Sequence, residues 1–274
     1  MFLLNKPVIG AIAQLGERNT GSVEVGGSIP PSSTKQKIFN SNNYSIEVLY
    51  HIGAYENSIH FIFDKATKTC AIVDPAWEPD LFLKKIHDKG YTLTDIWITH
   101  WHGDHTNAVD DIANKTGAKI TAGVNEVPYL NIENKVHTVT DGDTIKLGEV
   151  EIKIIETPGH TAGGVCYLLD EHLIAGDTLF VYGVGICSLA GSNPVTLFHS
   201  LKKLIAQVPD DIHLLCGHNY GSEITTTIAE QKKANPFLLI KDEDTFVRYR
   251  MHVHDSTRSY PMSPMTLKEV NALL

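Results

Sequence analysis

A dense cluster of metal-ligand side chains follows a short apolar segment near the middle of the chain. The cluster consists of His100, His102, Asp104 and His105. We predict that the preceding segment, Asp95–Thr99, is a buried strand, and that Gly103 lets the backbone bend tightly after it. Imidazole nitrogens and carboxylate oxygens bind Zn²⁺, iron and manganese. A lone His-x-His is ordinarily part of a solvated polar loop, but the complete pattern after a strand favours a metal site.

Three later segments carry further ligand-type side chains. In each of them a predicted strand is followed by a glycine and then by such a residue. The residues are His160, Asp177 and His218. Any one of these segments alone would fit a turn with a satisfied polar side chain. Taken together, in order behind the first cluster, they predict one site of seven residues built at the ends of several strands.

The periodicity of apolar residues predicts alternating strands and helices. The expected strands are Ser45–Tyr50, Ser58–Asp64, Cys70–Val73, Asp95–Thr99, Lys119–Ala122, Glu149–Glu156, Val165–Leu169, His172–Ala175 and His213–Cys216. The expected helices are Asp80–Lys89, Thr106–Thr116, Pro194–Gln207, Glu223–Ala234 and Thr266–Leu274. The first helix is expected to turn Leu81, Leu83, Ile86 and His87 toward one side. This order of elements predicts an α/β sandwich whose loops carry the chemistry.

The first 37 residues differ in composition from the rest of the chain. Gly21–Thr34 is rich in Gly, Ser and Pro and has no clear period, so residues 1–37 are expected to be disordered. An alternative is a spurious extension, of the kind read from a tRNA gene when a start is set too far upstream, with the native protein beginning near Ile38. For the rest of the chain we expect a core domain over residues 38–235 and a C-terminal helical extension over residues 236–274.

Charge and cysteine content narrow the class of protein. A formal charge of −9 does not favour nucleic acid or an anionic membrane as partner, and no apolar run is long enough to span a bilayer. The four cysteines form no Cys-x-x-Cys pair, which favours reduced thiols. The N-terminus lacks the apolar region of a signal peptide, so we expect a cytoplasmic location.

The full set of motifs resembles the metallo-β-lactamase fold superfamily, and within it the glyoxalase II-like branch, over residues 45–250. The resemblance implies a four-layer αββα sandwich with the metals at one edge, between the two sheets. It implies two divalent ions, with zinc expected and iron or manganese as alternatives. One ion would be held by His100, His102 and His160. The other would be held by Asp104, His105 and His218. Asp177 would bridge the two.

The same resemblance implies a hydrolytic mechanism. Two ions that share a water lower its pKa toward neutrality, and the bridging hydroxide attacks an electron-poor carbonyl. Asp104 and Asp177 would be the catalytic carboxylates, with Asp104 orienting the hydroxide. A thioester suits such a site because its thiolate leaves without a dedicated general acid. S-lactoylglutathione is the expected substrate, and Tyr220 matches the tyrosine that contacts glutathione in this branch, although an aromatic packed near the rim is an equal reading.

Two departures from the branch put glutathione recognition in question. Ile186 stands where a basic residue is expected, and Leu239 and Ile240 follow Phe237-Leu238 where an arginine is common. Arg248 or Arg250 would have to compensate, unless both are ordinary surface charges.

Three other functions remain open at this point. A persulfide dioxygenase would bind one iron through His102, His160 and Asp177. A lactonase, a β-lactamase or another ester hydrolase would use the same site. A non-catalytic metal-binding or redox protein would bind metal without turnover.

Overall fold

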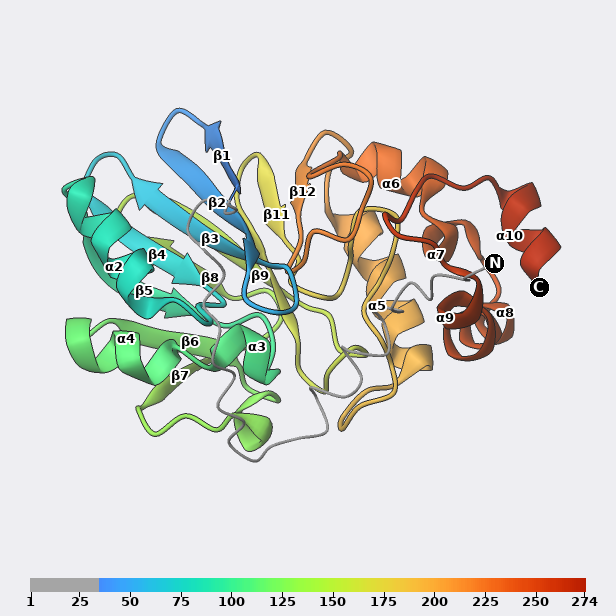
Figure 1. The fold of residues 1–274 in the computed structure, drawn as a ribbon, viewed down its shortest axis with the longest axis horizontal. Helices are drawn as coiled ribbons and strands as arrows, with labels where there is room; N and C mark the ends of the chain where they lie inside the picture. Colours follow the sequence, from blue (N-terminus) through green and yellow to red (C-terminus); the bar gives the residue numbers. More distant parts are fainter. Residues whose placement is uncertain (1–34) are drawn as a thin grey trace, which may run out of the picture.

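Two β-sheets packed face to face form the centre of the molecule, and helices cover both outer faces (Figure 1). The computed structural model describes residues 35–274. The predicted α/β sandwich is therefore confirmed, and the four layers run helix, sheet, sheet, helix.

The first sheet has seven strands in sequence order. They are β1 (Lys35–Asn40), β2 (Tyr44–Ile52), β3 (Asn57–Asp64), β4 (Thr69–Val73), β5 (Thr92–Trp97), β6 (Lys119–Gly123) and β7 (Val136–Val139). Strands β1 to β4 pair antiparallel, whereas β4 to β7 pair parallel. Parallel pairing places the carboxyl ends of β4, β5 and β6 at one edge, where the cluster after β5 begins.

The second sheet has five strands in the order β12-β11-β10-β9-β8. They are β8 (Thr144–Leu147), β9 (Val150–Glu156), β10 (Val165–Leu168), β11 (His172–Ile174) and β12 (His213–Leu215). Strands β11 and β12 run parallel and the other neighbours antiparallel. The carboxyl ends of β9, β11 and β12 therefore lie at the same edge of this sheet.

Three apolar clusters fill the spaces between the four layers. Helices α2 (Pro79–Asp88) and α4 (Val109–Thr116) bury apolar side chains against the first sheet. Helix α5 (Pro194–Gln207) covers the second sheet through its buried stripe of Leu197, Leu201 and Leu204. The third cluster lies between the sheets, where Trp97 stacks on Tyr167 with ring centroids 5.2 Å apart.

Several helices follow the last strand. They are α6 (Ile228–Ala234), α7 (Pro236–Leu239), α8 (Glu243–Arg248), the π-helix η3 (Tyr249–Val253), α9 (His254–Thr257) and α10 (Leu267–Leu273). Their buried residues Phe237, Phe246 and Tyr249 share one cluster with α5. The helices after Asn235 thus pack on the sandwich rather than around a core of their own.

The elements differ from the sequence expectations in several places. Strands β1, β7 and β8 were not predicted. The helix expected over Thr106–Thr116 is divided into α3 (Gly103–Thr106) and α4, and the helix expected from Glu223 begins only at Ile228, after a capping box formed by Thr227 and Glu230. Within α2 the buried residues are Phe82 and Ile86, whereas Leu81 is 37% exposed.

The expected disordered segment lies mostly outside the described residues, which begin at Lys35. Its last part, Lys35–Lys37, belongs to β1 and pairs with β2, so for these residues the expectation was wrong. Among the described residues no helix has both the length and the apolar character that a bilayer crossing requires.

The contact between the sheets gives the first testable prediction. Replacing Trp97 by alanine leaves a cavity between the layers, because this side chain is fully buried, and should lower the free energy of unfolding by about 3–5 kcal/mol. Urea denaturation at matched metal content measures this free energy of unfolding. Leu81→Ala on the outer face of α2 is the control and should change the value by less than about 1 kcal/mol; equal losses in both variants would contradict this account of the core.

Candidate metal centre

All seven predicted ligand residues lie at the edge where the carboxyl ends of β5, β9, β11 and β12 meet. His100 and His102 stand in the loop after β5, and Asp104 and His105 on the short helix α3 that follows. His160 lies in the β9–β10 loop, Asp177 follows β11 and His218 follows β12. The structure therefore brings together every residue that the sequence placed in the site.

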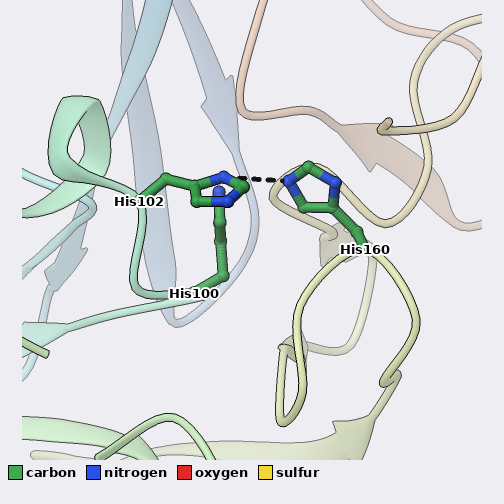
Figure 2. A group of neighbouring side chains, drawn as sticks. All are labelled: His100, His102 and His160. Carbon is green, nitrogen blue, oxygen red and sulfur yellow. Dashed lines mark hydrogen bonds between the residues drawn. The ribbon is translucent and has the colours of Figure 1, made fainter. Parts of the chain in front are cut away.

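The first group of potential ligands consists of His100, His102 and His160. Their ligand nitrogens lie within 4.8 Å of one another. Figure 2 shows His102 and His160 facing one another across the site, with His160 Nε2 3.1 Å from His102 Nδ1, while His100 rises from below toward the His102 ring. His102 and His100 come from one sheet and His160 from the other, so the group spans the two layers.

The second group consists of Asp104, His105 and His218, whose ligand atoms also lie within 4.8 Å of one another. The Nε2 atoms of His105 and His218 are 3.1 Å apart, and each lies 3.4 Å from Asp104 Oδ2. These two groups are the trios that the resemblance assigned to the two ions.

Asp177 lies between the two groups. Its Oδ2 is 3.3 Å from His218 Nε2 and 3.7 Å from His160 Nε2, and its Oδ1 is 3.6 Å from His105 Nε2. The carboxylate thus reaches both trios, as a bridging ligand must.

The outer nitrogens of these imidazoles are held by other parts of the chain. His160 Nδ1 bonds the carbonyl of Ile186 at 2.7 Å, and His218 Nδ1 bonds the carbonyl of Tyr55 at 2.8 Å. A carbonyl only accepts, so both nitrogens must carry the proton. In the neutral rings Nε2 is then a lone pair pointing into the site, the state that a metal requires.

Asp74 holds the third outer nitrogen and was missed by the sequence analysis. Its Oδ2 lies 3.1 Å from His105 Nδ1, and the same carboxylate accepts hydrogen bonds from the amide and the hydroxyl of Thr99 at 2.7 and 2.6 Å. Asp74 also forms a third geometric group with His100 and His105. Because Asp74 accepts from Thr99 and faces the outer nitrogen of His105, it supports the ligands from behind.

Burial and the neighbouring charges shift the pKa values of the ligand residues in opposite directions. Burial alone lowers the pKa of His105, but Asp104, Asp177 and Asp74 outweigh it and raise this pKa to about 10. Burial lowers the pKa of His102 to about 3. The pKa of Asp177 lies well below its usual value, because His218 and His105 outweigh the burial that would raise it. Buried carboxylates therefore create a strongly negative potential here.

The residues fit a cationic cofactor. The Nε2 atoms of His105 and His218 and an oxygen of Asp104 converge within hydrogen-bonding range. One of these atoms can donate to another only when a ring carries an extra proton, as the raised pKa of His105 indicates, and a metal ion would take the place of that proton. His100 Nε2 and Asp177 Oδ1 are buried and have no hydrogen-bond partner among the described residues. Buried acceptors that converge in this way are costly unless a cation satisfies them.

Glycines allow the loops to approach the site closely. A Cβ on Gly217 would lie 2.3 Å from Asp177 Oδ1, and one on Gly176 would lie 2.3 Å from the Thr99 hydroxyl. Gly103, in contrast, has no positive φ, and a Cβ at this position would meet no atom within 4 Å. The expectation that Gly103 is needed for a tight bend was therefore wrong; α3 simply begins there.

Tyr220 packs directly against the second group. Its ring stacks on His218 with centroids 4.8 Å apart and planes 2° apart, and its hydroxyl donates to the carbonyl of Tyr55 at 3.1 Å. This carbonyl is the one that holds His218. The structure thus gives Tyr220 a packing role beside the site.

Arg250 does not compensate for the missing basic residue. Its guanidinium is buried, pairs with both oxygens of Asp255 at 2.7 and 2.8 Å and contacts His254. Arg250 is thus neither a surface charge nor open to a substrate, whereas Arg248 is exposed.

Comparison with known proteins identifies relatives over most of the chain. A family model described as the metallo-beta-lactamase superfamily matches residues 55–218. A probable polyketide biosynthesis zinc-dependent hydrolase, BaeB, of Bacillus velezensis is 34% identical over 72% of this chain and 88% of its own. A hydroxyacylglutathione hydrolase of Maricaulis maris is 32% identical over 73% and 89%. The crystal structure of ETHE1 from Myxococcus xanthus superposes with a TM-score of 0.67 at 26% identity, covering 88% of this chain and 95% of the other.

The glycine contacts give a second prediction. Gly217→Ala should reduce bound metal sharply, because the new methyl group collides with Asp177 and His105. Gly103→Ala lies in the ligand cluster itself but meets open space, and should keep wild-type metal content. The number of metal ions per chain, measured by atomic emission after gel filtration, tests this prediction. Equal metal loss in the two variants would refute this packing argument.

Proposed function

The chain belongs to the metallo-beta-lactamase superfamily and to its glyoxalase II-like branch, and on this premise we propose that it is a binuclear metal-dependent thioester hydrolase. The observation that carries the proposal is the pair of ligand trios joined by Asp177. Two trios plus a bridging carboxylate are what two divalent ions need in order to share one water.

The cysteines, all of which lie among the described residues, do not offer a reactive nucleophile. All four cysteines are buried. Burial raises the pKa of Cys187 to about 12 and that of Cys166 to about 11, so neither thiol is reactive near neutral pH. Water is therefore the proposed nucleophile.

Two bound divalent ions would supply a water of lowered pKa and a Lewis acid for the carbonyl oxygen of the substrate. The chain orients the site around them. Asn57 donates through Nδ2 to Asp104 Oδ2 at 3.1 Å and to the Asp104 carbonyl at 3.0 Å, and Trp77 fixes Asn57 through its indole N–H. Asp104 is thereby held with an oxygen toward the site, where it would both bind a metal ion and orient the attacking water.

The proposed substrate class is a small-molecule thioester, with S-lactoylglutathione first. Relatives named hydroxyacylglutathione hydrolase support a glutathione thioester. The similarity to probable zinc-dependent hydrolases of polyketide biosynthesis supports zinc-dependent hydrolysis. Because the basic residue expected at position 186 is an isoleucine, the proposal includes acyl thioesters other than those of glutathione. Zinc is the proposed metal, with iron and manganese as alternatives.

Turnover of two thioesters tests this proposal. The zinc-loaded protein should release thiol from S-lactoylglutathione or from an acyl-pantetheine thioester, as followed with a thiol reagent, with two metals per chain measured in parallel. His160→Ala and His218→Ala should each lower kcat by at least about 100-fold, because each breaks one trio. Absence of thiol release with two metals bound would reject thioester hydrolysis.

A persulfide dioxygenase is the second candidate. The observation in its favour is that His160 adjoins both of the other residues that such an enzyme would use, with its Nε2 3.1 Å from His102 Nδ1 and 3.7 Å from Asp177 Oδ2. Oxygen consumption with glutathione persulfide by protein holding one iron, without thioester hydrolysis, would establish this function instead.

Tyr220 provides a further prediction. If its hydroxyl binds the glutathione moiety, Tyr220→Phe should raise KM for S-lactoylglutathione by about 10-fold, the value of one lost hydrogen bond to a charged or polar group, and leave kcat and metal content unchanged. The stacking on His218 is preserved in this variant. Steady-state kinetics on the metal-loaded protein measure both constants, and an unchanged KM would reduce Tyr220 to a packing residue.

A further inference from the structure

A buried glutamate connects the two loops that carry the first ligand trio. Glu126 lies between β6 and the short 3-10 helix η2 (Val127–Tyr129), and its side chain is fully buried. Its Oε2 accepts the backbone N–H of Trp101 at 2.7 Å, and its Oε1 accepts the backbone N–H of Gly163 at 2.6 Å. One carboxylate thus joins two chain segments that are 62 residues apart in the printed sequence.

The two segments are those whose spacing decides the first trio. Trp101 stands between His100 and His102, in the loop after β5 of the first sheet. Gly163 belongs to the β9–β10 loop of the second sheet, three residues after His160. Glu126 makes neither of these hydrogen bonds to α3 or to the segment around His218, so it does not join the two loops of the second trio.

The loops around this carboxylate are packed too closely to adjust freely. A Cβ on Gly163 would lie 2.5 Å from the Asn125 side chain, and one on Gly123 would lie 2.3 Å from the Gly163 carbonyl. The amide of Val165 also donates to the Thr99 carbonyl at 2.9 Å. Glu126 therefore acts within a tight contact between the sheets, where a small change in its length or charge displaces one loop against the other.

We propose that Glu126 is a positioning residue that sets the distance between His160 and the His100–His102 pair, and thereby the metal affinity of the first trio. This inference rests on the metal site of the proposed function, but not on any thioester being its substrate. A carboxylate suits the role because both of its oxygens accept and neither donates. Glutamine would turn an NH₂ group toward one of the two backbone donors and lose that hydrogen bond.

Zinc affinity measured for each trio separately tests the proposal. Glu126→Gln is combined with His218→Ala, which leaves the first trio intact, and with His160→Ala, which leaves the second. Competition with a chromophoric chelator gives the dissociation constant in each background. In the His218→Ala background Glu126→Gln should weaken zinc binding by about 10–100-fold, as expected for loss of a group that orients ligands. In the His160→Ala background the change should stay below about 2-fold.

A matched control separates positioning from stability. Glu47 is another buried glutamate, on β2, where it pairs with Lys85 and Lys89. Glu47→Gln should lower the melting temperature of the metal-free protein without changing zinc affinity in either background. Circular dichroism of every variant confirms folding. If Glu126→Gln does not fold, Glu126→Asp, which keeps both acceptors on a shorter side chain, is measured in the same way.

The outcomes divide clearly. Selective weakening of the first trio by the Glu126 variant that folds supports the inference. The inference would be overturned if Glu126→Gln weakened zinc binding equally in both trios or in neither. It would also be overturned if Glu47→Gln had an equal effect, or if the His218→Ala background bound no zinc. A folded protein that binds zinc as expected but hydrolyses no thioester would count against the hydrolase and leave the role of Glu126 standing.

Discussion

The site depends on the hydrogen bonds that hold the imidazoles from behind. His160 and His218 each donate Nδ1–H to a backbone carbonyl, and His105 faces Asp74 in the same way. Because the proton sits on the outer nitrogen, the inner nitrogen is available as a lone pair in each neutral ring. Without these acceptors the rings could rotate or change tautomer, and the same ligand residues would no longer form a binding site.

The sandwich explains why the ligand-bearing loops meet at one place. Parallel pairing of β4, β5 and β6 in one sheet, and of β11 and β12 in the other, brings several carboxyl strand ends to a common edge. The backbone groups that a strand leaves unpaired at its end then become partners for side chains of the neighbouring loop. Glu126 and Asp74 are such side chains, since both accept hydrogen bonds from backbone amides of ligand-bearing loops.

The ligand set could be predicted from the sequence because each ligand-type residue can be recognised from its own side chain and its immediate neighbours in the sequence. A histidine or aspartate placed after a strand and a glycine remains recognisable without knowledge of its neighbours in space. Asp74, Asn57 and Glu126 could not be found in this way, because what they bind is mostly backbone or a residue far along the chain. For the same reason the edge strands β1, β7 and β8, which are short or partly exposed, carry too little apolar pattern to be recognised. On α2 the prediction was right for Ile86 and wrong for Leu81 and His87, which are exposed. Leu81 and Phe82 are equally apolar, so the sequence alone did not distinguish which of them faces the core.

Position 186 shows why the metal chemistry and the substrate preference can change independently. The resemblance called for a basic side chain there, yet the contribution of Ile186 to the metal centre is its carbonyl, which accepts from His160. Any residue provides that carbonyl, so replacement of the side chain leaves the support of His160 intact. The buried pairing of Arg250 with Asp255 likewise commits this charge to the C-terminal helices. A chain can therefore keep all seven ligands in place while the surface that meets the substrate loses its affinity for carboxylates, and the substrate has to be identified from the rim of the site rather than from its metal ligands.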